Sequence, residues 1–385
     1  MCDTLAAVGS VTSTGATLFA KNSDRDHAEA QYLEWLPPAR HNAGEKVKLT
    51  YQAIDQARVT HGVLLSKPHW IWGAEMGANA HGLVIGNEAI FAKLEASTRP
   101  GVIGMDYVRL ALERAADVDE AIEVVTTVLR RYGQSGNCGF RRTLAYHNSF
   151  LLADRHSVKV LETVEREWTV MPVSDACAIS NAMTIESFRS VFEDETRSVS
   201  GRYRRARATT LLQERPGSLQ VRDLLRILRD HAEGPSIDGR PGARICAHRR
   251  ENPIGQTTAS WVSDLTPAKT IHWVTGTAAP CTGIFKPLLL DIGVPEHGPP
   301  PGALPESNSL WWRHEQLRRN LDESGPDVLA SFDEERTALE SGFLRAMAEC
   351  PALVDPASRS QARATVENCW REAWDFESRW LNQTL

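Results

Sequence analysis

Two short apolar runs at the start of the chain, separated by a small-polar turn, constrain the fold most. Residues 2–8 (CDTLAAV) and 16–21 (ATLFAK) have the composition of β-strands, and residues 9–15 (GSVTSTG) have that of a turn. The strands of such a hairpin pair in antiparallel fashion, so the start of the chain lies opposite about position 22. The charged run 21–26 (KNSDRD) is therefore expected beside the chain terminus.

The residue directly after Met1 is a cysteine. Methionine aminopeptidase removes Met1 when the next side chain is small, which leaves a thiol and a free α-amine on one residue. An α-amine has a pKa of ~7.7–8.0 and a thiol one of ~8.5, so the amine can take the thiol proton through a bridging water. A cysteine also occurs at position 2 by chance, and a charged run also forms solvated loops, so the rest of the chain has to decide.

Several separated blocks resemble the secernins and the related cysteine dipeptidases, which are N-terminal nucleophile (Ntn) hydrolases. Besides CDT at the start, they are FAKNSDRD (19–26), WGAEMGANAHGLVIGNEA (72–89), QTTAS (256–260), HWVTGTAAPCTGIF (272–285) and LWWRHE (310–315). The resemblance runs from Cys2 to about residue 286 and resumes at 310–315, so it covers most of the chain. Bile-salt hydrolases and penicillin V acylases are more distant relatives with the same N-terminal cysteine.

The resemblance implies roles for the residues of the opening hairpin. Cys2 matches the nucleophile of the family, and Asp24 matches the carboxylate that holds the α-amine of the cysteine. Lys21 matches the cation beside the sulfur. More distant relatives usually have arginine there, and a lysine supplies the charge without a bidentate fork.

Two asparagines and an arginine complete the implied site. Asn87 and Asn181 each close an apolar strand and match residues of the oxyanion hole, although an asparagine that ends a strand also commonly caps a turn. Arg202 matches an arginine near the nucleophile. Arg204 and Arg205 stand beside it, so the choice among the three is left open.

These residue types serve amide hydrolysis through a thioester. The reaction passes through two tetrahedral oxyanions, and each needs fixed hydrogen-bond donors. The protonated amine returns its proton to the departing nitrogen and then deprotonates the attacking water. The resemblance implies a small-molecule amide or peptide substrate, a dipeptide or an N-acyl amino acid above all, and no cofactor is required. A specialised acylase or acyltransferase and a non-catalytic, secernin-like interaction protein are the alternatives.

Other candidate sites carry weaker signals. Cys246 and His248 are two metal-ligand types close together, but no second ligand pair follows at zinc-like spacing, so no metal site is predicted. Thr257, Thr258 and Ser260 precede a predicted strand and either line a pocket or, as we favour, form the sheet. His272 alternates with apolar residues, which favours a buried histidine over a catalytic one.

Composition indicates an ordinary enzyme. With a net charge of −6 and a pI of about 6.1, the chain has no electrostatic footprint for nucleic acid. No window approaches ~18 consecutive apolar residues, so no membrane partner is expected. The seven cysteines, an odd number without a pairing pattern, favour a reducing, cytoplasmic location. A homo-oligomer is left open.

The pattern of elements predicts sheet, helices and sheet again. Helical spacing marks residues 105–116, 119–132, 202–213 and 221–231, and strands are expected at 82–87, 150–153, 158–163, 167–170, 177–181, 259–265 and 270–275. This predicts an α+β fold, and the resemblance implies the four-layer αββα sandwich of Ntn hydrolases.

A proline-rich break divides the chain. Residues 293–308 contain five prolines and are expected to connect two parts. We predict a catalytic domain at 2–292 and a helical C-terminal extension at 309–385, with helices at 309–320, 327–347 and 358–380. The extension carries Trp370 and Trp374 at helical spacing, which indicates packing onto the main domain or a second subunit.

Overall fold

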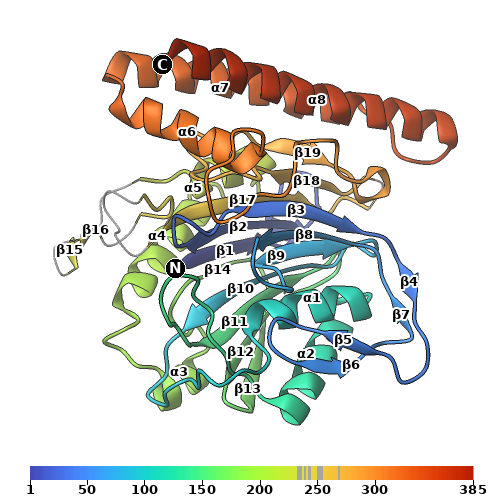
Figure 1. The fold of residues 1–385 in the computed structure, drawn as a ribbon, viewed down its shortest axis with the longest axis vertical. Helices are drawn as coiled ribbons and strands as arrows, with labels where there is room; N and C mark the ends of the chain where they lie inside the picture. The colour runs from blue at the N-terminus through green and yellow to red at the C-terminus, as the bar shows by residue number, and fades with distance from the viewer. Residues whose placement is uncertain (232–235, 238–239, 242–243, 249–254, 268, 385) are drawn as a thin grey trace.

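Two antiparallel sheets stack face to face at the centre of the molecule (Figure 1), which is a computed structural model that describes residues 1–384 except 232–235, 238–239, 242–243, 249–254 and 268. The first sheet has six strands in the order β14-β1-β2-β17-β18-β19. They are β1 (Cys2–Ala7), β2 (Leu18–Arg25), β14 (Ala176–Ile179), β17 (Gln256–Asp264), β18 (Ile271–Val274) and β19 (Lys286–Leu288).

The second sheet has seven strands in the order β13-β12-β11-β10-β9-β8-β3. They are β3 (Gln31–Leu36), β8 (Val63–Pro68), β9 (Met76–Asn79), β10 (Val84–Ile90), β11 (His147–Ala153), β12 (Val158–Val164) and β13 (Glu167–Pro172). The predicted hairpin around residues 154–157 is confirmed as the connection from β11 to β12.

The opening hairpin forms as β1 and β2, one residue out of the expected register. Cys2 lies opposite Ser23, and Thr4 lies opposite Lys21. Because side chains alternate along a strand, these four residues share one face of the sheet, and the residues between them share the other. The ion pair of Lys21 with Glu88 on β10 shows that this face is turned to the second sheet.

Helices cover the outer faces of both sheets. The helices α1 (Gly104–Arg114) and α2 (Val118–Tyr132) share an apolar cluster with Ile85 and Phe150 of the second sheet. On the outer face of the first sheet, α4 (Val199–Gln213) packs on β1 and β14, and α5 (Val221–Leu228) packs on β2 and β17, while the short α3 (Glu186–Phe192) lies between β14 and α4 in the chain. The predicted α+β class is confirmed, with predicted and observed helices agreeing to within a few residues at their ends.

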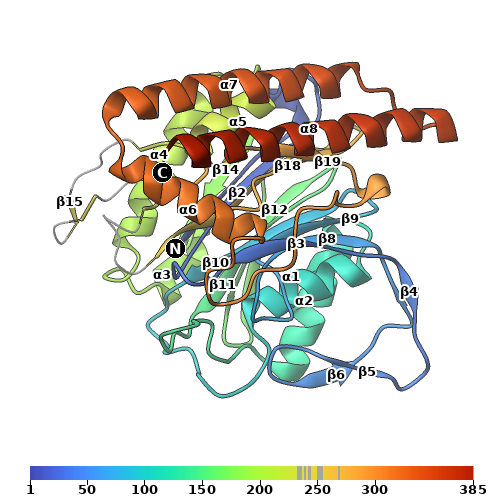
Figure 2. The same ribbon diagram turned by 45° about the horizontal axis from the view of Figure 1, so that its top comes forward.

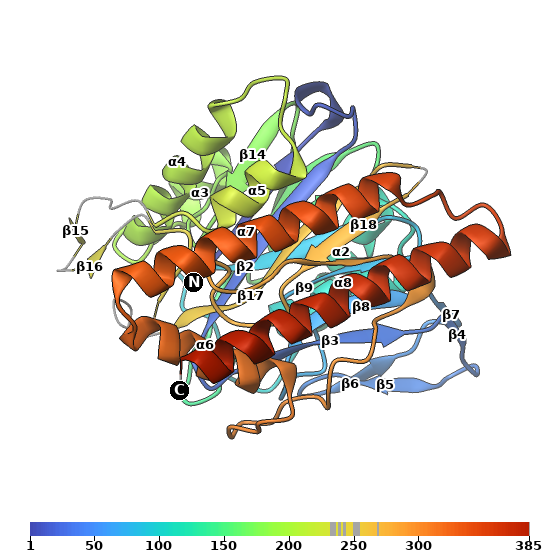
Figure 3. The same cartoon turned by 90° about the horizontal axis from the view of Figure 1, so that it is seen from above.

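Three C-terminal helices lie over the first sheet: α6 (Leu310–Glu323), α7 (Pro326–Glu349) and α8 (Pro356–Gln383). Figures 2 and 3 show α7 and α8 running antiparallel to each other above β18 and β19. The indole Nε1 of Trp370 donates to the carbonyl of Pro287 on β19 at 2.9 Å. Trp370 therefore packs the extension onto the main part of the chain, as one of the two expected alternatives proposed.

Short elements fill the connections. They are the strands β4 (Ala39–Arg40), β5 (Lys46–Lys48), β6 (Ala53–Asp55), β7 (Val59–Thr60), β15 (Ser236–Ile237) and β16 (Arg240–Pro241), and the 3-10 turns η1 (Gly9–Val11) and η2 (Leu290–Ile292). Across the described residues, no helix is both long enough and apolar enough to cross a membrane.

Candidate active site

The thiol of Cys2 lies between the two sheets, at the first residue of β1. The residue is only 6% exposed, and its Sγ lies 3.7 Å from Oε2 of Glu75. Burial raises the pKa of the Cys2 thiol to about 12; the Lys21 ammonium opposes the rise and the Glu75 carboxylate adds to it. With Met1 in place the sulfur is therefore a protonated thiol at neutral pH.

Lys21 lies fully buried on the same face as Cys2. Its Nζ donates to the backbone carbonyl of Asn87 at 2.7 Å and to Oε1 of Glu88 at 2.9 Å. Burial lowers the pKa of Lys21, but the Cys2 sulfur and the Glu88 carboxylate raise it by more than burial lowers it. The pKa of Lys21 therefore lies above the usual range. Gly86 makes room for this side chain, because a Cβ at Gly86 would lie 2.5 Å from Cδ of Lys21. A permanent positive charge thus sits beside the thiol.

The backbone nitrogen of Cys2 is held by Asn181. It donates to Oδ1 of Asn181 at 2.8 Å, and the amine of Met1 donates to the carbonyl of Asp24 at 3.1 Å. Asn181 also donates from Nδ2 to the carbonyl of Ala89, also at 2.8 Å. The chain terminus is therefore fixed by Asn181, just beyond the end of β14, and by Asp24, the next-to-last residue of β2.

The carboxylate of Asp24 lies on the outer face of β2. Its Oδ1 accepts from Oγ1 of Thr257 at 2.6 Å, while Oδ2 is buried and has no hydrogen-bond partner among the described residues. Burial raises the pKa of Asp24, whereas the N-terminal amine and Arg204 lower it. The unused oxygen can accept one further N–H bond.

Of the three neighbouring arginines, Arg204 is the one that reaches this site. Its Nη2 donates to Oδ1 of Asn181 at 2.5 Å, and its Nε pairs with the buried carboxylate of Asp3 at 3.0 Å. Arg202, which the sequence comparison singled out, instead pairs with Glu193 at 2.5 Å and is 30% exposed. Two positions on a helix separate these side chains by about 200°, so of the arginines left open by the sequence, Arg204 rather than Arg202 contacts Asn181 and Asp3.

The side chain of Asn87 points away from Cys2. Its Nδ2 donates to Oδ1 of Asn148 at 3.2 Å, on the face of β10 that α1 covers. The next residue, Glu88, takes the inward position and accepts from both Lys21 and Thr4. The predicted oxyanion role for the Asn87 side chain therefore finds no support in its contacts, because a shift of one residue turns a strand side chain to the other face.

Glu75 and Arg25 are members of the site that the sequence reasoning passed over. Arg25 donates to Oε1 of Glu75 at 2.5 Å, to Oε2 of Glu29 at 2.6 Å and to the carbonyl of Cys138 at 2.5 Å. Both residues lie inside the blocks that carry the resemblance. A buried arginine in KNSDRD needs acidic partners. An acidic residue in another block of the resemblance, such as Glu75, could therefore have been predicted as a partner of Arg25.

The remaining candidates take structural places. Thr257, Thr258 and Ser260 form part of β17, as favoured, and Thr257 also bonds Asp24. His272 is fully buried, with Nδ1 2.8 Å from Oγ of Ser263. A groove of about 830 Å³ lies between β3 and residues 290–300, and none of the candidate catalytic residues lines it.

Comparison with known proteins supports the fold. Residues 48–234 match the family described as acyl-coenzyme A:6-aminopenicillanic acid acyl-transferase. Two variants of the conjugated bile acid hydrolase from Clostridium perfringens superpose with TM-scores of 0.50 and 0.51, at 11% and 13% identity, over 76% and 75% of this chain and 93% of theirs. A penicillin V acylase from Agrobacterium tumefaciens gives a TM-score of 0.47 at 13% identity, over 75% of this chain and 86% of its own. The likeness to the bile acid hydrolase shows a shared fold and leaves the substrate open.

Proposed function

We propose that this chain, whose residues 48–234 match the family described as acyl-coenzyme A:6-aminopenicillanic acid acyl-transferase, is an Ntn hydrolase and acts as a cysteine amidohydrolase with Cys2 as nucleophile. The substrate is a small linear amide, a dipeptide or an N-acyl amino acid. One observation carries the proposal: Cys2 has its backbone nitrogen on Asn181 and its thiol 3.7 Å from Glu75, among buried charged side chains.

Removal of Met1 would turn the backbone nitrogen of Cys2 into an α-amine. At its present position this nitrogen lies 2.8 Å from Oδ1 of Asn181. The unpaired Oδ2 of Asp24 supplies a second acceptor for the amine. Because burial holds the thiol in its protonated form, the reaction needs a base beside the sulfur, and the α-amine of the same residue is that base.

The reaction forms a thioester on Cys2 and then hydrolyses it. The amine takes the thiol proton, the sulfur attacks the amide carbon, and a C–S bond forms as the carbonyl becomes an oxyanion. The C–N bond breaks while the ammonium gives its proton to the leaving nitrogen. Water, deprotonated by the amine, attacks the thioester and releases the acid and the free thiol.

Asn181 and Lys21 are the groups we propose for the oxyanion and the thiolate. Asn181 uses one N–H on Ala89 and has a second to offer the oxyanion. Lys21 stabilises the negative sulfur by its charge. Arg204 and Asp3 position Asn181, because Arg204 donates to both.

Transfer of the acyl group to an amine is the second candidate. The matched family is described by an acyl-transferase, and a thioester can be released to an amine as well as to water. We further propose the four-layer αββα arrangement, the division at residues 292 and 309, and a reducing cytoplasmic location, which the seven unpaired cysteines support.

The test combines intact mass with a substrate panel. We expect the purified chain to have lost Met1 and to release amine from members of a panel of dipeptides, N-acyl amino acids and penicillin V. Cys2→Ala abolishes this release and Cys2→Ser lowers it by at least about 100-fold, while Cys177→Ala leaves it unchanged. Acyl transfer is detected by adding hydroxylamine as acceptor.

Each failure has a distinct meaning. Unchanged turnover in Cys2→Ala rules out Cys2 as the nucleophile, and full retention of Met1 in an active sample rules out the amine as base. A chain without Met1 that is inactive across the whole panel contradicts the proposed substrates and favours the interaction protein.

A further inference from the structure

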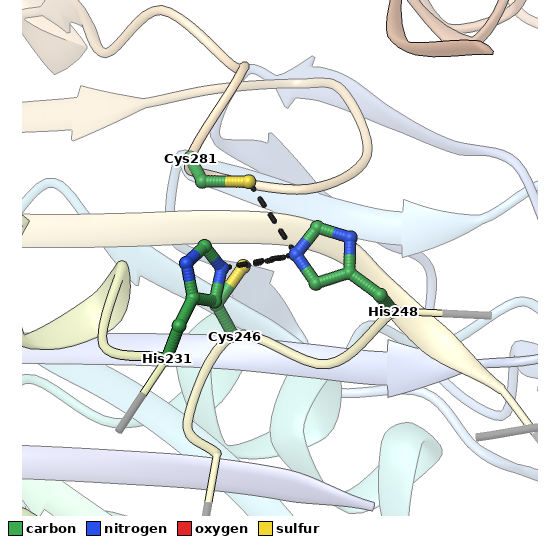
Figure 4. A group of neighbouring side chains, drawn as sticks. All are labelled: His231, Cys246, His248 and Cys281. Atoms are coloured by element: carbon green, nitrogen blue, oxygen red, sulfur yellow. Dashed lines mark hydrogen bonds between the residues drawn. The ribbon is translucent and has the colours of Figure 1, made fainter. Parts of the chain in front are cut away.

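Four metal-ligand side chains meet at one point outside the candidate active site. They are His231, Cys246, His248 and Cys281, and their ligand atoms all lie within 4.8 Å of one another. Figure 4 shows the two imidazoles and two thiols pointing toward one another from three segments. His231 follows α5, Cys246 and His248 precede β17, and Cys281 lies in the loop between β18 and β19.

Three of the six distances among the ligand atoms lie close to the edges of a tetrahedral zinc site. With Zn–S bonds of ~2.3 Å and Zn–N bonds of ~2.0–2.1 Å, a tetrahedron has N···S edges of about 3.5 Å and an N···N edge of about 3.3 Å. The Nε2 of His248 lies 3.5 Å from the Sγ of Cys246 and 3.5 Å from that of Cys281. The Nε2 atoms of His248 and His231 lie 3.0 Å apart. The other pairs lie within 4.8 Å, so small side-chain shifts would let one ion reach all four atoms.

The donor set is equally specific. Two thiols and two imidazoles form the Cys₂His₂ set that zinc takes in structural sites, and oxygen-preferring ions such as magnesium do not use it. Hydrogen bonding alone is a poor account, because Nε2 of His248 has a single proton or a single lone pair and yet faces two sulfurs and another imidazole nitrogen. We propose that His231, Cys246, His248 and Cys281 bind one Zn²⁺ ion.

Four protein ligands leave no open coordination position, so this ion is structural. Cys246 is buried, while His231, at the edge of the cluster, is exposed. The short spacing of Cys246 and His248 hinted at a ligand pair, but the other two ligands come from distant segments. Because the fold alone brings them together, a search for spaced motifs could not find the site.

The site adjoins the residues that hold Asp24. Ala247, between two ligands, donates to Oγ1 of Thr257 at 3.0 Å and accepts from the backbone N–H of Thr257 at 3.0 Å. The same hydroxyl donates to Asp24 at 2.6 Å. The ion therefore fixes the segment that orients Thr257 and, through it, Asp24. The effect on turnover rests on the proposed function, whereas the metal site does not.

The experiment measures metal in the full-length chain. Protein purified without chelator and with thiols kept reduced is analysed for metal by mass spectrometry. We expect about one zinc per chain in the wild type and in Cys177→Ser. In Cys281→Ser and His231→Ala, the zinc content after dialysis against a weak chelator falls at least about tenfold. His231→Ala is the safer variant for folding, because this side chain is exposed.

Cobalt gives a readout independent of activity and of variant stability. Replacing the ion with Co²⁺ in the wild type is expected to give the visible bands of a tetrahedral ion and a thiolate charge-transfer band, which weakens in Cys281→Ser. Wild-type protein that binds neither metal after reduction overturns the proposal, as does equal zinc in wild type and both variants. A native disulfide between Cys246 and Cys281, detected by mass after alkylation, overturns it as well.

Discussion

At the scale of single residues, the balance of buried charge decides how the Cys2 sulfur behaves. Carboxylates outnumber cations around it; the acidic members are Asp3, Asp24, Glu29, Glu75 and Glu88, and the basic ones are Lys21, Arg25 and Arg204. Lys21 favours the thiolate, and Glu75 opposes it. Among the charged groups, Lys21 lowers the pKa of the Cys2 thiol most, so Lys21 is the main counter-charge of a thiolate.

Changing Glu75 to glutamine is expected to lower the pKa of the Cys2 thiol. The Glu75 carboxylate lies 3.7 Å from the sulfur and raises its pKa, so its neutral isostere removes that contribution. Alkylation of Cys2 by iodoacetamide, followed against pH by mass spectrometry, is expected to rise at a pH at least about one unit lower in Glu75→Gln than in the wild type.

Glu29→Gln is the matched control. Glu29 binds the same Arg25 but is not among the groups that set the thiol pKa. Its alkylation profile is expected to stay within a few tenths of a pH unit of the wild type. Equal shifts in both variants would trace the effect to Arg25 instead of Glu75.

Arg204 and Arg202 are expected to separate in their effect on catalysis. Arg204 lowers the pKa of Asp24, so Arg204→Gln raises it, and the acidic limb of the kcat/KM profile moves to higher pH. Arg204 also holds Asn181, so kcat falls at least about 100-fold. Arg202→Gln, whose native partner is Glu193, leaves the pH profile in place. Identical pH profiles for the two variants would show that Arg204 does not contribute to the active site.

At the scale of elements, alternation along strands determines which neighbours enter the site. On β10 the inward positions are held by Gly86 and Glu88, and the intervening Asn87 faces α1. Asn181 differs, because it lies just beyond the end of β14, where the backbone no longer alternates. Alternation therefore predicts the face that a side chain takes only for residues within a strand, and not for residues beyond its end.

Many of the elements were predictable, because periodicity is local, although β3, β8, β9 and α3 were not among those expected. The helices predicted at 105–116 and 119–132 form as α1 and α2, and the hairpin predicted at the N-terminus forms as β1 and β2. The family resemblance carried by the motifs is also confirmed. The partners of Arg204, the face of Asn87 and the meeting of Cys281 with His231 follow from tertiary packing, which a single sequence does not encode in any local pattern.

Close contact between α4 and β14 makes Gly201 a sensitive position. A Cβ at Gly201 would lie 2.5 Å from the backbone carbonyl of Asn181, so Gly201→Ala forces the helix and the end of the strand apart. Overpacking of this kind costs about 1–3 kcal/mol of unfolding free energy. Because Asn181 moves with its backbone, we also expect kcat to fall at least about tenfold.

Gly342→Ala provides the comparison within α7. Its added Cβ meets no atom within 4 Å, so the gain in helix propensity is expected to raise the free energy of unfolding by about 0.5–1 kcal/mol. Urea denaturation measures both variants. A Gly201→Ala protein as stable and as active as the wild type would show that α4 does not hold Asn181 in place.

At the scale of the whole molecule, the C-terminal helices contact the strand that carries Thr257. The indole Nε1 of Trp311 on α6 donates to the carbonyl of Thr258 at 2.9 Å, and Gln256 donates to Glu315 on α6 at 3.2 Å. Farther along, Arg229 pairs with Glu340 of α7 at 2.6 Å. These buried bonds tie the extension to both β17 and the end of α5, so we expect one cooperative unit.

Trp311→Phe tests this coupling with a small change. The variant keeps an aromatic ring but leaves the buried carbonyl of Thr258 without its donor, at a cost of about 1–3 kcal/mol, to which the smaller ring adds. We expect guanidinium unfolding, followed by tryptophan fluorescence and by exposure of the buried Cys138 thiol, to shift to lower denaturant with both probes together. Trp374→Phe, at a half-buried position where Arg313 stacks on the ring, is expected to shift the midpoint less. If the midpoint reported by fluorescence shifted while that reported by the Cys138 probe stayed at the wild-type value, the extension would unfold by itself. The bond from Trp311 would then not stabilise β17 beside Asp24.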